Sequence, residues 1–258
     1  PKLLEEIIEH NYDSIIHSCN ETKDTKFKCD VFKRSMTYAG LGYTFNAADF
    51  WTIYKWHRYT DIFSEVMRPQ GYHPTQGPLY PKDVGQAKDL FVILYTTQVS
   101  TPTKPFRMST HSPFNIPNVL KGFGIQIEPG TETHITVTPT VYEANENLKS
   151  IPIGKRNCQF QSENPLKLFK NYSMEGCIFE CLIEEASKST ECIPWDYPHM
   201  NISQQTCDAG ARYDFQVLMK DGENHLKCEQ QCMRECNGIE YIPSVSTLPL
   251  EYPRLTCN

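Results

Sequence analysis

The chain has 258 residues, of which 39% are hydrophobic and 22% are charged, and its formal net charge is −6. This length supports a hydrophobic core and one or two domains without help from disulfides. The acidic balance argues against a nucleic-acid partner, which needs a basic stripe, and no apolar run approaches the roughly 20 residues that span a bilayer.

The N-terminal region is predicted to be helical over residues 1–38, because its first apolar side chains recur at helical spacing. Cys19 and Cys29 flank a polar stretch, which we expect to be a surface loop closed by a disulfide between them. Residues 43–46 follow two closely spaced glycines and favour a short strand.

Residues 50–63 are dense in aromatic side chains, and two interpretations are open. They form either a contact surface for a partner or the partly buried face of an irregular helix, and the second arrangement is the commoner one. Residues 68–86 are rich in Pro and Gly and are predicted to be loop.

The middle of the chain is predicted to be β-sheet. Residues 90–98 and 104–110 are typical of two strands that form one hairpin. Residues 123–130 alternate apolar and polar side chains, turn at Pro129-Gly130 and continue as a strand over 134–138, which predicts a second hairpin.

Two helices and an extended tail are predicted in the C-terminal part. Ser173 is a suitable N-cap for a helix that carries Cys177 and Cys181. A second helix is predicted over 213–219, and residues 238–258 are expected to be mostly extended.

Eight of the 11 cysteines fall between positions 158 and 236. Residues four apart share one face of a helix, so a helix with two such cysteines can face an antiparallel run that carries two more. Eight cysteines allow on the order of a hundred pairings, so this geometry gives a preferred order only. The preferred nested pairs are Cys158–Cys236, Cys177–Cys232 and Cys181–Cys228, with Cys192–Cys207 closing a small loop.

Disulfides need an oxidising compartment, which predicts an extracellular chain. A zinc site is disfavoured because no C-x-x-C pair is present, and the spacing from Cys228 to Cys236 fits neither common ferredoxin pattern. Glycosylation sequons at Asn20, Asn171 and Asn201 agree with secretion.

Catalytic motifs are lacking in the sequence. It has no G-x-S-x-G, no H-E-x-x-H and no phosphate-binding glycine loop, and its eight histidines are scattered without ligand spacing. An enzyme is therefore the weaker class of function, and we expect neither a cofactor nor a metal.

Six motifs occur in an order that resembles one family. They are Gly40–Asn46, His111–Pro117, Gly124–Gly130, Lys155–Cys158, Tyr172–Cys181 and Cys192–Pro198. Together with the cysteines they resemble the extracellular domain of degenerin, epithelial sodium channel and acid-sensing ion channel subunits, over residues 19–252.

The resemblance implies an α+β, disulfide-rich, hand-like ectodomain with a β-sheet palm and β-ball core and a helical finger and thumb. It implies finger helices leading into a palm strand at 1–45 and an insertion and loop on the finger and knuckle side at 46–89. It further implies β-ball and palm strands at 90–157, and a disulfide-laddered thumb with the start of the return to the palm at 158–258. The pair Cys19–Cys29 would be the finger disulfide.

The same resemblance implies a trimeric, sodium-selective, amiloride-blockable channel, with this domain on the extracellular side of the plasma membrane. Its partners would be sibling subunits in a homo- or heterotrimer, sodium ions, and an extracellular peptide or protein ligand. The family's membrane helices and selectivity filter are missing here, so we expect this chain to be part of a longer protein. The alternative is a secreted or receptor-type disulfide-rich binding domain that does not belong to a channel.

Three positions concern cysteines of the family pattern. The family often has cysteines where this chain has Gly42 and Thr190, so the corresponding pairs are not expected. Cys257 is left over and either pairs outside this chain or is a free thiol.

The acid-sensing relatives use clustered carboxylates that correspond here to Thr110, His111 and Gly210, while Asp214 keeps its acid. Without partner carboxylates, the repulsion that tunes such a pocket to acid is lost. We therefore expect that a gating pocket formed by His111 and Asp214 would not open the channel in response to protons.

Overall fold

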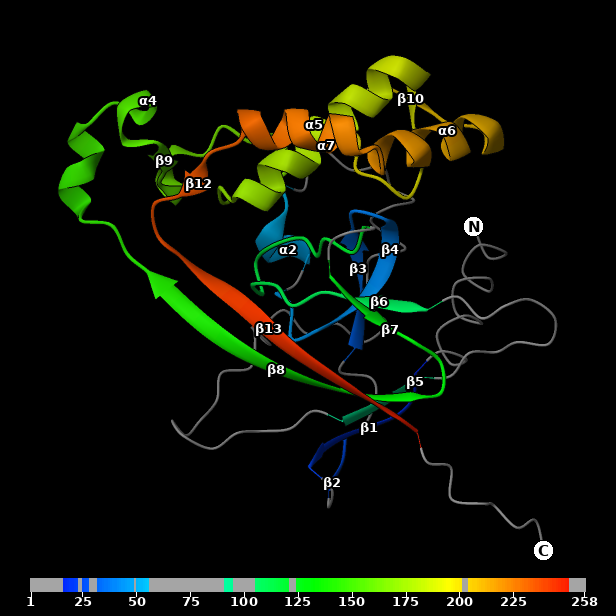
Figure 1. The fold of residues 1–258 in the computed structure, drawn as a ribbon. Coiled ribbons are helices and arrows are strands. Elements are labelled where there is room, and N and C mark those ends of the chain that lie inside the picture. Colours follow the sequence, from blue (N-terminus) through cyan, green and yellow to red (C-terminus); the bar gives the residue numbers. More distant parts are fainter. Residues whose placement is uncertain are drawn as a thin grey trace, which may run out of the picture.

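The structure is a computed structural model that mixes helices and strands (Figure 1). Three helices lie together at one end of the molecule, and a long two-stranded ribbon runs from them toward the opposite end. Within the described ranges, no helix is both long and apolar enough to cross a membrane. The residues that the structure describes are 16–22, 25–27, 32–48, 50–55, 91–94, 105–120, 124–200 and 204–250.

The ribbon consists of β8 (Thr131–Tyr142) and β13 (Gly238–Pro249), which pair antiparallel along all 12 residues of each strand. Gly238 lies opposite Tyr142 at the helical end, and Pro249 lies opposite Thr131 at the far end. At about 3.4 Å per residue, the ribbon is about 40 Å long. It therefore joins the two ends of the chain segment that contains the helices to the far end of the molecule.

The remaining strands form small sheets. β1 (Ile16–Thr22) pairs antiparallel with β2 (Thr25–Phe27) and with β5 (Phe91–Leu94). Two more antiparallel pairs are β3 (Phe32–Thr37) with β4 (Gly40–Phe45) and β6 (Phe106–Met108) with β7 (Ile125–Ile127). Two parallel pairs are β10 (Cys192–Ile193) with β11 (Gln205–Thr206) and β9 (Cys158–Gln159) with β12 (Arg234–Glu235).

The three grouped helices are α5 (Met174–Thr190), α6 (Ala209–Met219) and α7 (Gly222–Gln231). Each begins at a residue whose side chain accepts a hydrogen bond from the backbone N–H three residues on, which is the usual N-cap arrangement. These caps are Ser173, Asp208 and Asp221. The shorter helices are α2 (Phe50–Ile53), η3 (Glu146–Ser150), α4 (Ile153–Arg156) and η4 (Gln161–Glu163).

The expected cap at Ser173 and the helix that follows it are therefore confirmed. The helix predicted over residues 213–219 is also present and begins earlier, at Ala209. Of the segment expected to be mostly extended over 238–258, Gly238–Pro249 forms β13, and residues 251–258 lie outside the described residues.

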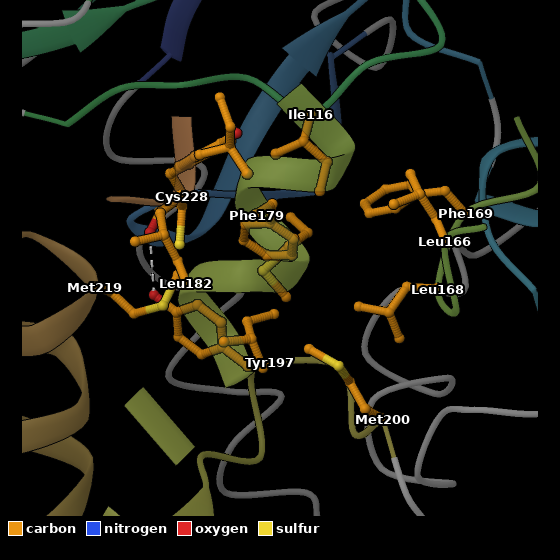
Figure 2. Packing of buried hydrophobic residues seen from close by; sticks show 14 of the residues in the cluster. Ile116, Leu166, Leu168, Phe169, Phe179, Leu182, Tyr197, Met200, Met219 and Cys228 are labelled. Carbon is orange, nitrogen blue, oxygen red and sulfur yellow. Dashed lines mark hydrogen bonds between the residues drawn. The ribbon is translucent and has the colours of Figure 1, made fainter. Parts of the chain in front are cut away.

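The main core surrounds Phe179 of α5, which is completely buried (Figure 2). The ring of Tyr38, from the turn between β3 and β4, lies 5.2 Å from the Phe179 ring, and the ring of Tyr197 stacks on it at 6.3 Å. Phe215 of α6 lies 5.1 Å from Tyr197. These aromatic contacts join two of the helices to a turn that comes from the N-terminal part of the chain.

The prediction of helix over residues 1–38 is wrong where the structure describes that region. Residues 16–22, 25–27 and 32–37 are strands, so the helical finger expected within 1–45 does not hold for them. Met36 and Tyr38, two positions apart, are both buried. Short apolar runs fit either periodicity, and here pairing with β4 and burial in the core decide in favour of a strand.

Both predicted hairpins are also wrong. β5 pairs with β1, and β6 pairs with β7, so the strands expected to form the first hairpin are not partners. The turn at Gly130 exists, with φ of 74°, but β8 leaves it to pair with β13. A partner of 12 residues offers β8 many more ladder hydrogen bonds than the three-residue β7 could.

The structure describes residues 50–55 of the aromatic segment. Tyr54 is buried, bridges to Phe169 as an isolated strand pair, and has its ring 5.2 Å from the Phe169 ring. This part of the segment therefore packs against the core, as expected for a partly buried irregular face.

Gly124 precedes β7 with φ of +78°, and a Cβ there would lie 2.6 Å from the carbonyl oxygen of Met108. We expect Gly124→Ala to destabilise the protein by about 1–3 kcal/mol, because alanine is strained in the left-handed region and would collide with backbone. A lower midpoint of urea unfolding measures this. Gly154→Ala in α4 is the control, since nothing lies within 4 Å of its Cβ position. Equal midpoints for the two variants would contradict the expectation.

Candidate functional site

Four disulfides hold together residues 158–236, which we call the helical unit. Cys177 and Cys181 of α5 bond to Cys232 and Cys228, with Cα–Cα distances of 5.8 and 5.7 Å. Because the earlier cysteine of α5 bonds to the later one of the second run, α7 lies antiparallel to α5. Two bonds one helical turn apart prevent the helices from sliding or rotating against each other.

A third disulfide, Cys158–Cys236, closes the helical unit where the chain enters and leaves it, with a Cα–Cα distance of 5.0 Å. Beside it β9 pairs with β12, and the N–H of Cys236 donates to the carbonyl oxygen of Gln159 at 2.9 Å. The almost fully buried Arg156 donates to the carbonyl oxygen of Cys158 at 2.9 Å and pairs with Glu163. Entry and exit are thus fixed to each other.

The fourth disulfide, Cys192–Cys207, joins β10 to β11. The structure therefore contains the four pairs that the nested order describes. The expected pair Cys19–Cys29 includes Cys29, which lies outside the described residues, as does Cys257.

Tyr38 ties the β3–β4 turn to the helical unit through both ends of the residue. Its hydroxyl donates to the carbonyl oxygen of Glu175 at 2.5 Å, and its own carbonyl oxygen accepts from the hydroxyl of Tyr197 at 3.3 Å. Burial raises the pKa of Tyr38 well above its ordinary value. Its hydroxyl consequently stays protonated and remains a donor.

Asp196 supplies a charged contact within the helical unit and is only 2% exposed. Arg212 of α6 donates to both of its carboxylate oxygens, from Nε at 3.1 Å and from Nη2 at 2.7 Å. The guanidinium also lies over the ring of Trp195, 5.7 Å from its centroid. Such a bidentate pair compensates the cost of burying the carboxylate.

Like charges meet where the helical unit joins the ribbon, and we call this region the junction. Glu175 lies in the first turn of α5, Glu235 in β12 and Glu240 in β13. All three carboxylates act on Tyr142 of β8: burial raises the pKa of this tyrosine, and their charges raise it further. The junction thus gathers three acids from three different elements.

For two of these acids, the charged form of the side chain is disfavoured in the folded protein. Burial raises the pKa of Glu175, and the charge of Glu240 adds to the effect. Burial also raises the pKa of Glu235, followed by the charge of Glu175, while Arg234 acts in the opposite direction. The Glu175 carboxylate accepts a hydrogen bond from the neutral side chain of Asn115 at 3.0 Å. A neutral donor leaves the repulsion in place.

His111 and Asp214, the residues of the expected gating pocket, come from different parts of the fold. His111 follows β6, is half-buried, and its Nδ1 lies 2.8 Å from the carbonyl oxygen of Ser112. Burial lowers the pKa of His111. Asp214 is exposed on α6, and in the part of the chain that the structure describes no hydrogen bond or ion pair joins the two residues.

Of the three sequon asparagines, Asn171 is exposed and lies two residues before the cap of α5. Asn20 lies in β1, for which the structure describes the backbone, and Asn201 lies outside the described residues. Among the described residues, no group of three or more His, Cys, Asp or Glu side chains could hold a metal ion.

A model of the family described as amiloride-sensitive sodium channel matches residues 2–255. The chain belongs to this family. The amiloride-sensitive sodium channel family consists of ion channels and not of enzymes, so the resemblance seen in the ordered motifs is confirmed. The assignment also favours a channel subunit over a secreted binding domain.

Individual relatives agree with the family assignment. Pickpocket protein 28 and pickpocket protein 11 of Drosophila melanogaster are 26% and 30% identical over 145 and 147 residues. Epithelial sodium channel subunit beta of Xenopus laevis is 28% identical over 158 residues. These matches cover 55%, 55% and 56% of this chain but 24%, 28% and 23% of the relatives. The channel-family chain therefore matches about a quarter of the length of these curated relatives.

The two disulfides between α5 and the Cys228–Cys232 run should be partly redundant, because either one alone keeps the two helices together. Replacing Cys177 and Cys232 by alanine should cost about 2 kcal/mol, and likewise for Cys181 and Cys228. Removing both bonds should cost more than the sum of the two losses, because only then can α7 separate from α5. Urea unfolding of the three variants measures this, and strictly additive losses would contradict it.

Glu175→Gln should stabilise the protein at neutral pH. Because the pKa of Glu175 is raised on folding, the folded state holds its proton more tightly than the unfolded state. Its contribution to stability is therefore lost as pH rises from the unfolded pKa through the folded one. Glutamine keeps the oxygen that accepts from Asn115 and removes the charge.

The measurement is the urea midpoint of wild type and variant from pH 4 to 8. The gain should be present at pH 7 and vanish below the ordinary glutamate pKa, which is roughly 4.3. Glu143→Gln, at an exposed position after β8, makes the same charge change and should leave the midpoint unaltered. A lower midpoint for Glu175→Gln at pH 7 would refute the repulsion at the junction.

Proposed function

We propose that this chain is the extracellular gating and ligand-sensing domain of a subunit of a trimeric, sodium-selective, amiloride-sensitive cation channel. The observation that carries the proposal is the family match over residues 2–255. The four disulfides support it further, because they suit an extracellular location. In the hand-like plan of the resembled channels, the helical unit is the thumb and the ribbon belongs to the palm.

In this proposal the helical unit acts as a rigid lever. Its disulfides oppose local unfolding, so a force applied to α6 or α7 moves the unit as a whole. The chain passes from Cys236 into β13 within two residues, and β8 leads to the unit from the other side. A displacement of the lever is therefore transmitted along the 12-residue ribbon and not absorbed within the helices.

The junction is the pivot of this lever. The charge of Glu240 in the ribbon opposes that of Glu175 in the helical unit, which makes their approach less favourable at neutral pH. A ligand that separates or neutralises the two carboxylates shifts the equilibrium between lever positions by its differential affinity for them.

Assembly with sibling subunits, in a homo- or heterotrimer, uses the apolar face of the ribbon. Directly opposed residues share a face, and this face carries Val141 opposite Ile239 and Ile135 opposite Val245. Val141 is 62% exposed and Ile239 46% exposed. A two-stranded ribbon is marginally stable alone, and an exposed apolar face of this kind marks an interaction surface.

The stimulus that fits this arrangement is an extracellular peptide, a protein ligand or mechanical load. Protons acting on His111 and Asp214 fit less well, because no hydrogen bond or ion pair joins these residues in the described structure and burial lowers the pKa of His111. Sodium ions would pass through the full-length channel.

The test is to express the full-length subunit in oocytes, alone and with a sibling subunit, and to record currents. A sodium-selective current blocked by amiloride is expected, and Val141→Asp should reduce it by weakening assembly, with the exposed Glu143→Gln as control. Lowering external pH from about 7.4 to about 5 should evoke no large transient inward current. A proton-evoked current that disappears in Asp214→Asn would overturn the gating proposal. The absence of any cation current would overturn the channel assignment.

A further inference from the structure

The sequon Asn171-Tyr172-Ser173 is built into the start of α5. Asn171 is exposed, whereas Tyr172 and Ser173 are only 2% and 7% exposed. The chain therefore passes from the surface into the core within this tripeptide. The asparagine that would carry the glycan is exposed, and the serine that completes the sequon is buried.

The Ser173 hydroxyl is occupied in the folded protein. Its Oγ accepts a hydrogen bond from the N–H of Gly176 at 3.0 Å, and its carbonyl oxygen accepts from the N–H of Cys177 at 2.9 Å. A Cβ on Gly176 would lie 2.9 Å from the same Oγ, so the hydroxyl is closely enclosed. Capping the helix and offering this hydroxyl to an enzyme exclude each other.

Tyr172 fixes the middle of the sequon. Its hydroxyl donates to the carbonyl oxygen of Met233 at 2.6 Å, and burial raises its pKa to about 12. Met233 directly follows Cys232, which is bonded to Cys177 in α5. Closing the Cys177–Cys232 bond therefore brings together the groups that bury the sequon.

The requirement for Ser or Thr two residues after Asn shows that the glycosylating enzyme recognises that hydroxyl as well as the amide. In transfer, the Asn171 Nδ2 forms a bond to the anomeric carbon of an oligosaccharide, and the bond from that carbon to a lipid pyrophosphate breaks. The lipid pyrophosphate leaves with the electron pair, and one amide proton passes to a base of the enzyme. The donor is thus a lipid-linked oligosaccharide.

We propose that Asn171 is an N-glycosylation site that can be modified only before α5 is capped and joined to α7, so that its occupancy records how fast the helical unit closes. The inference rests on the proposed extracellular location. A glycan added in time is compatible with the fold, because Asn171 itself is exposed. Once Ser173 has capped the helix, the site is closed to the enzyme.

The test translates the full-length subunit into microsomes that contain the transferase and its donor, with and without dithiothreitol. The reductant prevents the Cys177–Cys232 bond and delays closure, so the fraction of Asn171 carrying glycan, measured by glycopeptide mass spectrometry, should rise severalfold. Protein folded without glycan and then offered transferase and donor should stay unmodified at Asn171 until it is reduced and unfolded. Equal modification of folded and unfolded protein would overturn the proposal.

Matched variants separate the two roles of the hydroxyl. Ser173→Asp keeps a capping oxygen but destroys the sequon, so it should lose the glycan and keep the wild-type melting temperature of unglycosylated protein. Ser173→Ala should lose the glycan and melt at a lower temperature, while Asn171→Gln should behave like Ser173→Asp. Equal melting temperatures for the Asp and Ala variants would show that the hydroxyl does not cap α5 and would overturn the proposal.

The other sequons distinguish failure of this inference from failure of the location on which it rests. If Asn171 stays unmodified under reductant while Asn20 or Asn201 carries glycan, the inference fails and the extracellular location stands. If none of the three is modified, the extracellular location is refuted together with the inference.

Discussion

Two disulfides one helical turn apart determine how the helices of this domain can pack. With Cys177 and Cys181 on one side of α5, the residues that lie about half a turn away face in the opposite direction. Phe179, Leu182 and Ile183 occupy that side and are buried. The bonded face therefore holds α7 and leaves the other face free for the aromatic core, which in turn receives Tyr38 from the N-terminal sheet.

Charges are treated differently inside the helical unit and at its boundary. Inside, Asp196 is buried but receives two hydrogen bonds from Arg212, so its charge is compensated. At the boundary, the charge of Glu175 in the unit and the charge of Glu240 in the ribbon oppose each other. The buried charge inside the unit is thus compensated by an opposite charge, whereas the like charges at its boundary with the ribbon are not.

The sequence predicted what is encoded locally. The Ser173 cap depends on a residue type and its neighbours, so it could be derived before the fold was known. The spacing of the cysteines made the nested order the preferred one among many pairings. The polar helix α7 gave no such signal, because its buried residues are His225 and Cys228 and its apolar Leu226 is exposed.

Pairings between distant segments could not be derived in the same way. The partner of β8 is β13, which lies beyond the whole helical unit in the chain, and no local pattern in β8 identifies it. The contact of Tyr38 with Glu175 likewise spans 137 positions. The junction acids are also individually ordinary in the sequence, and become distinctive only when three elements bring them together.

The parallel pairing of β9 with β12, sealed by Cys158–Cys236, has an evolutionary consequence. A segment whose two ends are adjacent can be inserted into or replaced within a protein with little disturbance of its surroundings. The helical unit is such a segment, inserted between the two strands of the ribbon. Changes within this unit can therefore leave the register of the ribbon intact, provided that they keep the core face that the unit shares with Tyr38 and Ile116.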